Sequence, residues 1–372
     1  AAATPSAIVP APNSSPHPEI AHLSALGDLC YQFLHDRVQQ AAYSLIDEAD
    51  RAPVHYRLGR LLWTQIPEAD RGDRIFEIVN PLNLGRSLIT DPQERIALAH
   101  LNDQAAQRAR GATAYGAVRN YSSLALDLLG ETRWQSYYRL TLGLHALGAE
   151  AAALEGDFET MDRWIAAALD QISSPLDRVP LAQIQIKAFA AQEKHQAAVD
   201  ATLSLIAALG SSLPEQPTPE EIGAEIGAVV GLLGDDPIAV LRNLPPMTDP
   251  TSLALMEIAA AVIASAYRAG SPLFPLLVTL QVRLSLTQGR NPWSAFGYSL
   301  LGITLMAGGS NIDLSLKIGQ YARELALEPD SKVVRAGTLN IVAIFINPRM
   351  APLAESLTIA EQGYQAGLET GD

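Results

Sequence analysis

Residues 155–172 read EGDFETMDRWIAAALDQI, a tight turn followed by a segment with helical spacing. The apolar residues that recur every three or four positions are Phe158, Met161, Ile165, Ala168 and Ile172. This spacing puts them on one face of an α-helix, while Glu159 and Asp162 lie off that face. The turn separates this helix from a second helical stretch, residues 133–154, so the sequence predicts a helix hairpin.

Start and stop signals extend this pattern along the chain. A side-chain acceptor before proline predicts a helix start, because proline needs no N–H partner at the first helical position. Such pairs are Asp91-Pro92, Ser174-Pro175, Thr218-Pro219, Asp236-Pro237, Asp249-Pro250, Ser271-Pro272 and Asn291-Pro292. Glu94 and Glu221 stand three residues after two of these caps and predict capping boxes. Glycines mark the predicted ends, at Gly111, Gly130, Gly156, Gly210, Gly270, Gly289 and Gly308.

These signals divide most of the chain into helix pairs. The predicted pairs are 92–110 with 114–129, 133–154 with 158–172, 176–191 with 196–209, 250–269 with 272–288, and 292–307 with 312–327, before a last pair that begins at Lys332. First helices follow one another at roughly 40 residues, somewhat longer than a tetratricopeptide repeat. We therefore predict an all-α fold, an α-solenoid of tetratricopeptide-like hairpins in which each hairpin covers the apolar face of its neighbour.

Composition limits the partners of this chain. The formal charge of −14 disfavours nucleic acid and anionic membranes, which need a basic face. Cys30 is the only cysteine, so neither an intramolecular disulfide nor a cysteine metal site is expected. Neither a secretory signal nor an uninterrupted apolar membrane span is visible in the sequence. We expect a cytoplasmic protein, and the missing initiator methionine indicates a piece of a longer one.

No motif for catalysis is present. The sequence lacks a phosphate-binding loop of the form GxxxxGK[ST], the dinucleotide motif GxGxxG, the zinc motif HExxH and the serine elbow GxSxG. It also lacks the HRD and DFG motifs of protein kinases. We therefore expect no catalytic residue, no metal site and no enzyme activity in this part of the chain.

Two aromatic clusters are candidates for ligand or partner binding. They are Trp134, Tyr137 and Tyr138 in one place, and Trp293 with Phe296 and Tyr298 in another. Both clusters stand at starts of first helices, which line the concave face of tetratricopeptide-like arrays. The alternative is that these rings only join neighbouring repeats.

Residues 33–46, FLHDRVQQAAYSLI, carry a family resemblance. An apolar residue, Leu34, precedes His35 and Asp36, and a helical run follows. This motif resembles the end of the winged-helix module in bacterial signalling ATPases of the STAND class, in particular the predicted-ATPase region of multidomain Ser/Thr and histidine kinases. The similarity continues more loosely through residues 75–85, where Pro81 departs from the polar residue of the family.

The resemblance implies that His35 contacts ADP bound by an ATPase domain, with ATP or ADP and Mg²⁺ as cofactors of the parent protein only. The implied partners are the adjacent ATPase and kinase domains, an unknown protein or small-molecule signal, and a second copy of the chain. A histidine at an element boundary can also be purely structural. The parent would be a kinase with an ATPase module.

The expected organisation follows from the resemblance and the helix pattern together. Its segments are a flexible linker or wing insertion (1–22), the C-terminal part of a winged-helix module (23–52), connecting helices (53–90), tetratricopeptide-like pairs (91–210), an irregular helical insertion (211–248) and further pairs (249–372). The expected function is a non-catalytic sensor and protein-interaction region that relays binding to an adjacent ATPase. The alternative is a passive peptide-binding or oligomerisation scaffold without a nucleotide switch.

Overall fold

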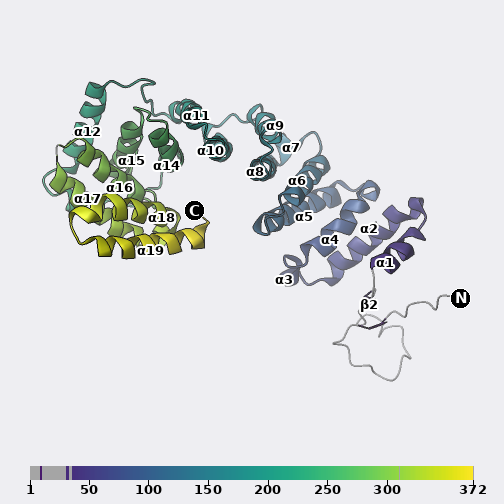
Figure 1. Ribbon diagram of the computed structural model, residues 1–372. Coiled ribbons are helices and arrows are strands. Elements are labelled where there is room, and N and C mark those ends of the chain that lie inside the picture. Colours follow the sequence, from purple (N-terminus) through teal and green to yellow (C-terminus); the bar gives the residue numbers. More distant parts are fainter. Residues whose placement is uncertain (1–8, 11–30, 33–35, 310, 372) are drawn as a thin grey trace. The chain divides into compact units, whose positions relative to one another are not determined.

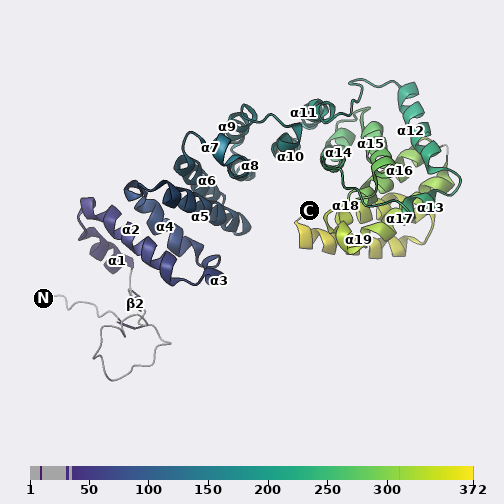
Figure 2. The ribbon, with the colours of Figure 1, turned by 180° about the vertical axis from the view of Figure 1, so that it is seen from behind.

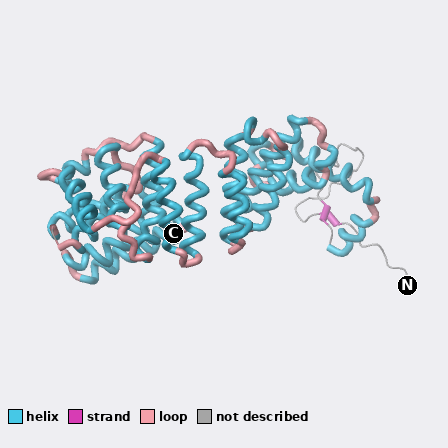
Figure 3. Tube along the Cα trace, turned by 90° about the horizontal axis from the view of Figure 1, so that it is seen from above, coloured by secondary structure: helices cyan, strands magenta, loops and turns pink. Residues whose placement is uncertain are grey.

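The computed structural model describes residues 9–10, 31–32, 36–309 and 311–371. The chain forms two compact units, Ala1–Tyr138 and Arg139–Asp372. Apart from one antiparallel strand pair, β1 (Val9–Pro10) with β2 (Tyr31–Gln32), the described elements are all helices, as Figure 3 shows. The predicted all-α class is therefore confirmed.

Helices of the first unit pack in chain order. They are α1 (Asp36–Ser44), α2 (Glu48–Gln65), α3 (Glu68–Arg71), α4 (Ile75–Leu84), the 3₁₀ turn η2 (Arg86–Leu88), α5 (Pro92–Gly111), α6 (Tyr115–Leu129) and α7 (Arg133–Ser136). Helix α4 lies between α2 and α5 (Figure 2). Gly59 permits the close approach of α2 to α4, because a Cβ there would lie 2.6 Å from Cγ of Leu82.

A buried amide pair joins α4 to α5. Asn83 Nδ2 donates to Asn102 Oδ1 at 2.8 Å, and Asn102 Nδ2 donates back to Asn83 Oδ1 at 2.9 Å. Asn102 also donates to the carbonyl of Leu98 at 2.9 Å. Both side chains are buried, so their mutual bonds satisfy groups that would otherwise be costly to remove from water.

Glu94 joins α5 to α2 and corrects one predicted capping box. Its N-cap, Asp91, accepts from the amide of Gln93 as expected. The Glu94 carboxylate instead accepts from Tyr56 Oη at 3.0 Å and from Arg60 Nη1 at 2.8 Å. Burial and the neighbouring carboxylate raise the pKa of Tyr56, while hydrogen bonding to Glu94 raises the pKa of Arg60. Hydrogen bonds from α2 thus take the place of the predicted bond between the Glu94 side chain and the backbone of its own helix start.

The second unit contains the remaining helix pairs, shown in Figure 1. They are α8 (Tyr138–Leu154), α9 (Phe158–Leu169), α10 (Pro175–Ala191), α11 (His195–Ala208), α12 (Pro219–Leu233), α13 (Pro237–Arg242), α14 (Pro250–Arg268), α15 (Phe274–Gln288), α16 (Ser294–Ala307), α17 (Ile312–Ala326), the 3₁₀ turn η3 (Pro329–Ser331), α18 (Lys332–Ile341), the π-helical turn η4 (Val342–Ile346), the 3₁₀ turn η5 (Asn347–Arg349) and α19 (Leu353–Thr370). Segment 211–248 thus contains one 15-residue helix, α12, and one six-residue helix, α13, joined by loops.

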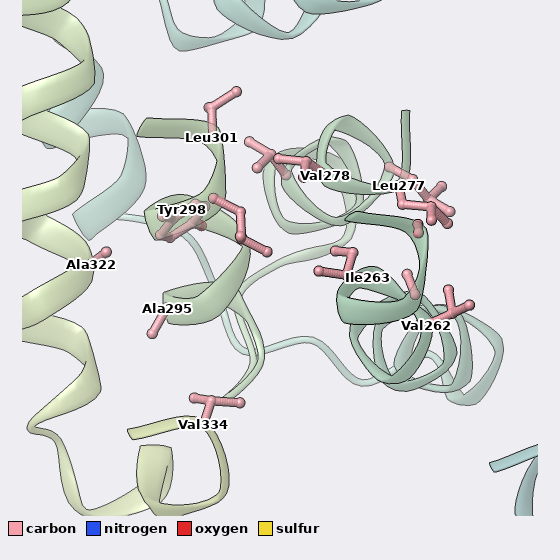
Figure 4. Close-up of a cluster of buried hydrophobic side chains, with 14 of the residues drawn as sticks. Val262, Ile263, Leu277, Val278, Ala295, Tyr298, Leu301, Ala322 and Val334 are labelled. Carbon is pink, nitrogen blue, oxygen red and sulfur yellow. The ribbon is translucent and has the colours of Figure 1, made fainter. Parts of the chain in front are cut away.

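One hydrophobic core runs through the second unit from Val179 of α10 to Ile359 of α19. Figure 4 shows its centre, where Tyr298 of α16 lies among aliphatic side chains. A core that continues across successive helices is the packing expected when each pair covers the apolar face of the previous one.

One predicted helix is interrupted, and two predicted helix starts need correction. The predicted helix 133–154 is broken between α7 and α8 at Tyr137, whose ψ of 41° is not helical. Helices α15 and α16 begin two residues after Pro272 and Pro292, because a turn precedes each one. In the first turn Ser271 Oγ accepts from the amide of Leu273, and in the second Ser294 Oγ accepts from the amide of Asn291. The five other proline caps begin helices where predicted.

A short backbone bridge fixes the end of the 211–248 segment. Met247 N donates to Arg290 O at 2.8 Å, and Arg290 N donates to Pro245 O at 2.7 Å. Gly289 makes this approach possible, because its φ is +103° and a Cβ would lie 2.4 Å from Pro245 O. Any other residue at position 289 would break the bridge.

Among the described helices, α14 alone is long and apolar enough to cross a membrane. However, 61% of its apolar window is buried inside the protein. Helix α14 packs against α10, α11 and α15, as a buried core helix does.

Candidate functional site

His35, the expected ADP contact, lies outside the described residues. Helix α1 begins directly after it, at Asp36. The expected apolar face of this helix ends early, because Leu45 follows α1 and is 85% exposed. The winged-helix assignment and the role of His35 remain predictions.

The first aromatic cluster lies at the end of the first unit, on the one-turn helix α7 and the start of α8. The rings of Trp134 and Tyr138 meet edge to face, with centroids 5.8 Å apart. Tyr137 lies between them in sequence, and all three side chains are half-buried. The cluster keeps apolar ring surface in contact with solvent, as a ligand contact requires.

Trp293 belongs to a different environment. It is the residue before α16, it is half-buried, and it packs against the hydrophobic core of the second unit. Its neighbour Tyr298 is 1% exposed, and burial raises the pKa of its hydroxyl to about 12. This second cluster therefore contributes mainly to packing, and its half-buried members Trp293 and Phe296 keep some surface that a ligand could reach.

A cleft that the sequence did not predict lies between α11 and the loop before α12. Its volume is about 760 Å³. The polar side chains that line it are Gln196, Asp200, Ser204, Glu215, Gln216 and Ser271. Asp200 accepts a hydrogen bond from Gln196 at 2.8 Å. Two carboxylates and no basic residue give this cleft an acidic lining, which suits a cationic or hydrogen-bonding ligand.

Within the described residues, no group of three or more His, Cys, Asp or Glu side chains is arranged to hold a metal ion. The carboxylate whose pKa burial raises is Asp103, on α5, where Gln107 lies within hydrogen-bonding range. Neither residue lines the cleft or the aromatic clusters.

No protein-family model and no solved structure matches the chain. A curated relative is the hybrid signal transduction histidine kinase G of Dictyostelium discoideum, which is 22% identical over 388 residues. The match covers 92% of this chain and 11% of that protein. The chain is thus similar, over nearly its whole length, to about a tenth of a much longer kinase.

Proposed function

We propose that this chain is a regulatory region of a multidomain signalling kinase, where it recognises a ligand or partner and performs no reaction. The observation that carries the proposal is the extent of the match. Nearly the whole chain corresponds to a small part of a hybrid histidine kinase, which leaves most of that relative for other activities. The helical architecture and the recognition-type surfaces agree with such a role.

The finer form of the proposal concerns the fold. We interpret the helix pairs as a tetratricopeptide-like solenoid preceded by the end of a winged-helix module. The continuous core from α10 to α19 supports the solenoid, because stacked repeats bury one shared core. In this proposal His35 contacts ADP, and the adjacent ATPase module of the parent supplies nucleotide and Mg²⁺ binding. The ATPase would be of the STAND class, and the location cytoplasmic.

Two surfaces are our candidates for sensing. The half-buried rings of Trp134 and Tyr138 offer an aromatic platform, while the acidic cleft beside Asp200 offers hydrogen bonds and negative charge. A peptide with basic residues would satisfy the cleft, because its cationic groups would meet two carboxylates.

The test uses the longer protein that contains the ATPase module. We expect it to copurify with ADP, and we expect His35→Ala to lower the bound ADP measured by chromatography after denaturation. His55→Ala is the matched control, because this nearby histidine only bonds Tyr43 Oη at 2.9 Å within the helices. Equal loss of ADP in both variants, or no loss in either, would refute the nucleotide-sensing form of the proposal.

A second candidate function is a passive scaffold that binds a peptide or its own copy without a nucleotide switch. The observation that favours it is a row of exposed apolar side chains on the last helix, α19. A regulatory region and a self-associating scaffold differ in nucleotide response, so the ADP measurement separates them.

A further inference from the structure

A hollow of the first unit is formed by the end of α4, the turn η2, the start of α5 and the end of α6. Its volume is about 460 Å³. The residues that line it are Leu84, Arg86, Ser87, Arg95, Asp127 and Leu128. Two guanidinium groups, one hydroxyl group, one carboxylate and two leucine side chains thus share one small space, which we call the arginine hollow.

The two arginines of this hollow have no carboxylate within ion-pair range among the residues that the structure describes. Arg86 Nη1 donates to the backbone carbonyl of Asn83 at 2.9 Å, and Arg95 Nη2 donates to that of Asp127 at 3.5 Å. A guanidinium group has five N–H donors, so most of these donors remain for another acceptor. The unit also contains arginines that pair with carboxylates, namely Arg60, Arg74 and Arg108. Together, the two guanidinium groups of the hollow suit a bound carboxylate.

Negative charge is present in the same hollow. Asp127 contributes a carboxylate, and it stands in the last turn of α6, which ends at Leu129. Helix α4 also ends here, at Leu84. The C-terminus of a helix carries partial negative charge, so both helix ends attract a cation and repel an isolated anion. The arginine hollow therefore combines donors for an anion with attraction for a cation.

We infer that the arginine hollow binds a free α-amino acid with an apolar side chain. At neutral pH such a molecule carries a carboxylate and an ammonium group on one carbon atom. The carboxylate accepts from Arg86 and Arg95, and the ammonium group donates to Asp127. The apolar side chain covers Leu84, which is 58% exposed. The inference rests on the proposed function only in that a regulatory region needs a signal to recognise.

Ligands with one sign of charge fit this hollow less well. Inorganic phosphate would meet the two arginines, but the carboxylate of Asp127 and the two helix ends would repel it. A polyamine would meet Asp127, but the arginines would repel it. The charged residues of the hollow are exposed, so solvent weakens each contact. We therefore expect a dissociation constant on the order of 1 mM, which rises with salt concentration.

Ligand-detected NMR titration of the chain tests the inference, with L-leucine as the probe. N-acetyl-leucine lacks the ammonium charge and leucinamide lacks the carboxylate. Each should bind about two- to fivefold more weakly than leucine, because each loses one set of charged contacts. Glycine should also bind more weakly, because it leaves Leu84 uncovered. Phosphate and spermidine are the single-sign ligands for comparison.

Three variants connect binding to the arginine hollow. Arg86→Gln should weaken leucine binding about two- to fivefold. Arg57→Gln is the matched control, because Arg57 is an exposed arginine of α2 that also donates to a backbone carbonyl, that of Pro53 at 3.4 Å. Asp127→Asn should remove most of the preference for leucine over N-acetyl-leucine and keep the preference over leucinamide. A general loss of structure would not separate the two analogues in this way, and circular dichroism checks that each variant is folded.

The outcomes that overturn the inference are specific. They are no binding of leucine, binding of phosphate or spermidine as tight as that of leucine, and equal effects of Arg86→Gln and Arg57→Gln. These titrations use the chain itself and need no ATPase module, so their failure leaves the ADP measurement on His35→Ala untouched. Unchanged ADP retention together with selective leucine binding would refute nucleotide sensing and leave the amino-acid site in place.

Discussion

The indole of Trp164 on α9 lies directly against the backbone of Gly148 on α8. A Cβ at position 148 would come within 2.6 Å of Cε3 of the ring, closer than such atoms approach in proteins. His145, one turn earlier, hydrogen-bonds through Nδ1 to the backbone carbonyl of Trp164 at 3.1 Å. Its ring also meets the indole edge on, with centroids 5.4 Å apart. One glycine and one tryptophan thus set the spacing of this hairpin.

Gly148→Ala should destabilise the second unit by about 1–3 kcal/mol, because the added methyl group forces the indole or the helix to move. Gly143→Ala, on the same helix, is the matched control. Position 143 has no atom within 4 Å of its Cβ site, so alanine there should stabilise by up to about 1 kcal/mol through helix propensity. Urea unfolding followed by circular dichroism measures both. The same change at both positions would contradict this description of the hairpin.

The Asn83–Asn102 pair should show strong coupling. Replacing one member by leucine leaves the other amide buried without its partner, at a cost of about 1–3 kcal/mol. The double variant Asn83→Leu/Asn102→Leu should cost less than the sum of the two single variants, because no amide is left unpaired. A double-mutant cycle on the free energy of unfolding measures the difference. Additive effects would mean that the two amides do not depend on each other.

Alkaline pH should destabilise the second unit through Tyr298. Burial raises the pKa of its hydroxyl to about 12 in the folded protein, above the ordinary tyrosine value of about 10. The stabilisation is complete below pH 10 and is lost as the pH rises toward 12, because only the unfolded state ionises in that window. The loss is about 1.4 kcal/mol for each pH unit.

Unfolding in urea at about pH 9 and about pH 11 checks this expectation, with Tyr298→Phe as the comparison. The phenylalanine variant should lose less stability between the two pH values. Tyr56, Tyr121 and Tyr321 also have raised pKa values and remain in both proteins. Tyr56 and Tyr121 therefore cancel in the difference, whereas Tyr321, whose ring centroid lies 6.0 Å from that of Tyr298, helps to raise the pKa of Tyr298 and belongs to the same effect. An identical pH dependence in both proteins would show that Tyr298 ionises as readily folded as unfolded.

Among the residues that the structure describes, two non-glycine residues occupy left-handed turns, Thr113 with φ of 56° and Glu193 with φ of 58°. Glycine avoids the steric cost of this conformation, which is roughly 1 kcal/mol or more for other residues. Glu193→Gly should therefore stabilise the α10–α11 turn. Gly156 occupies the corresponding α8–α9 turn with φ of 77°, so Gly156→Glu should destabilise that turn. Thermal unfolding midpoints measure both, and a lower midpoint for Glu193→Gly would contradict the argument.

Local chemistry in the sequence located most helices. Caps such as Asp249 before Pro250 and the capping box of Thr218 with Glu221 act within one turn, so sequence alone identifies them. The starts after Ser271 and Asn291 were misplaced by two residues, because serine hydroxyls there stabilise a turn before the helix.

Contacts between distant parts of the chain could not be predicted in this way. The sequence predicted that Glu94 caps the start of its own helix. In the structure its carboxylate instead accepts hydrogen bonds from Tyr56 and Arg60 of α2, which lie 34 or more residues earlier in the chain. The acidic cleft likewise joins side chains from α11, from the following loop and from Ser271. Of the expected binding residues, the structure brings Trp134 and Tyr138 together and packs Trp293 on the core.

The most direct test of the central claim uses the longer protein that we propose contains this chain and an ATPase module, and measures its ATP turnover intact and after removal of residues 139–372. If this chain regulates and does not catalyse, the shortened protein should still hydrolyse ATP, at a changed rate, because the catalytic groups lie elsewhere and their control is gone. Loss of all turnover on removal, together with turnover by the isolated chain, would place the reaction inside the helical array and contradict the account. An identical rate with and without these residues would also contradict it.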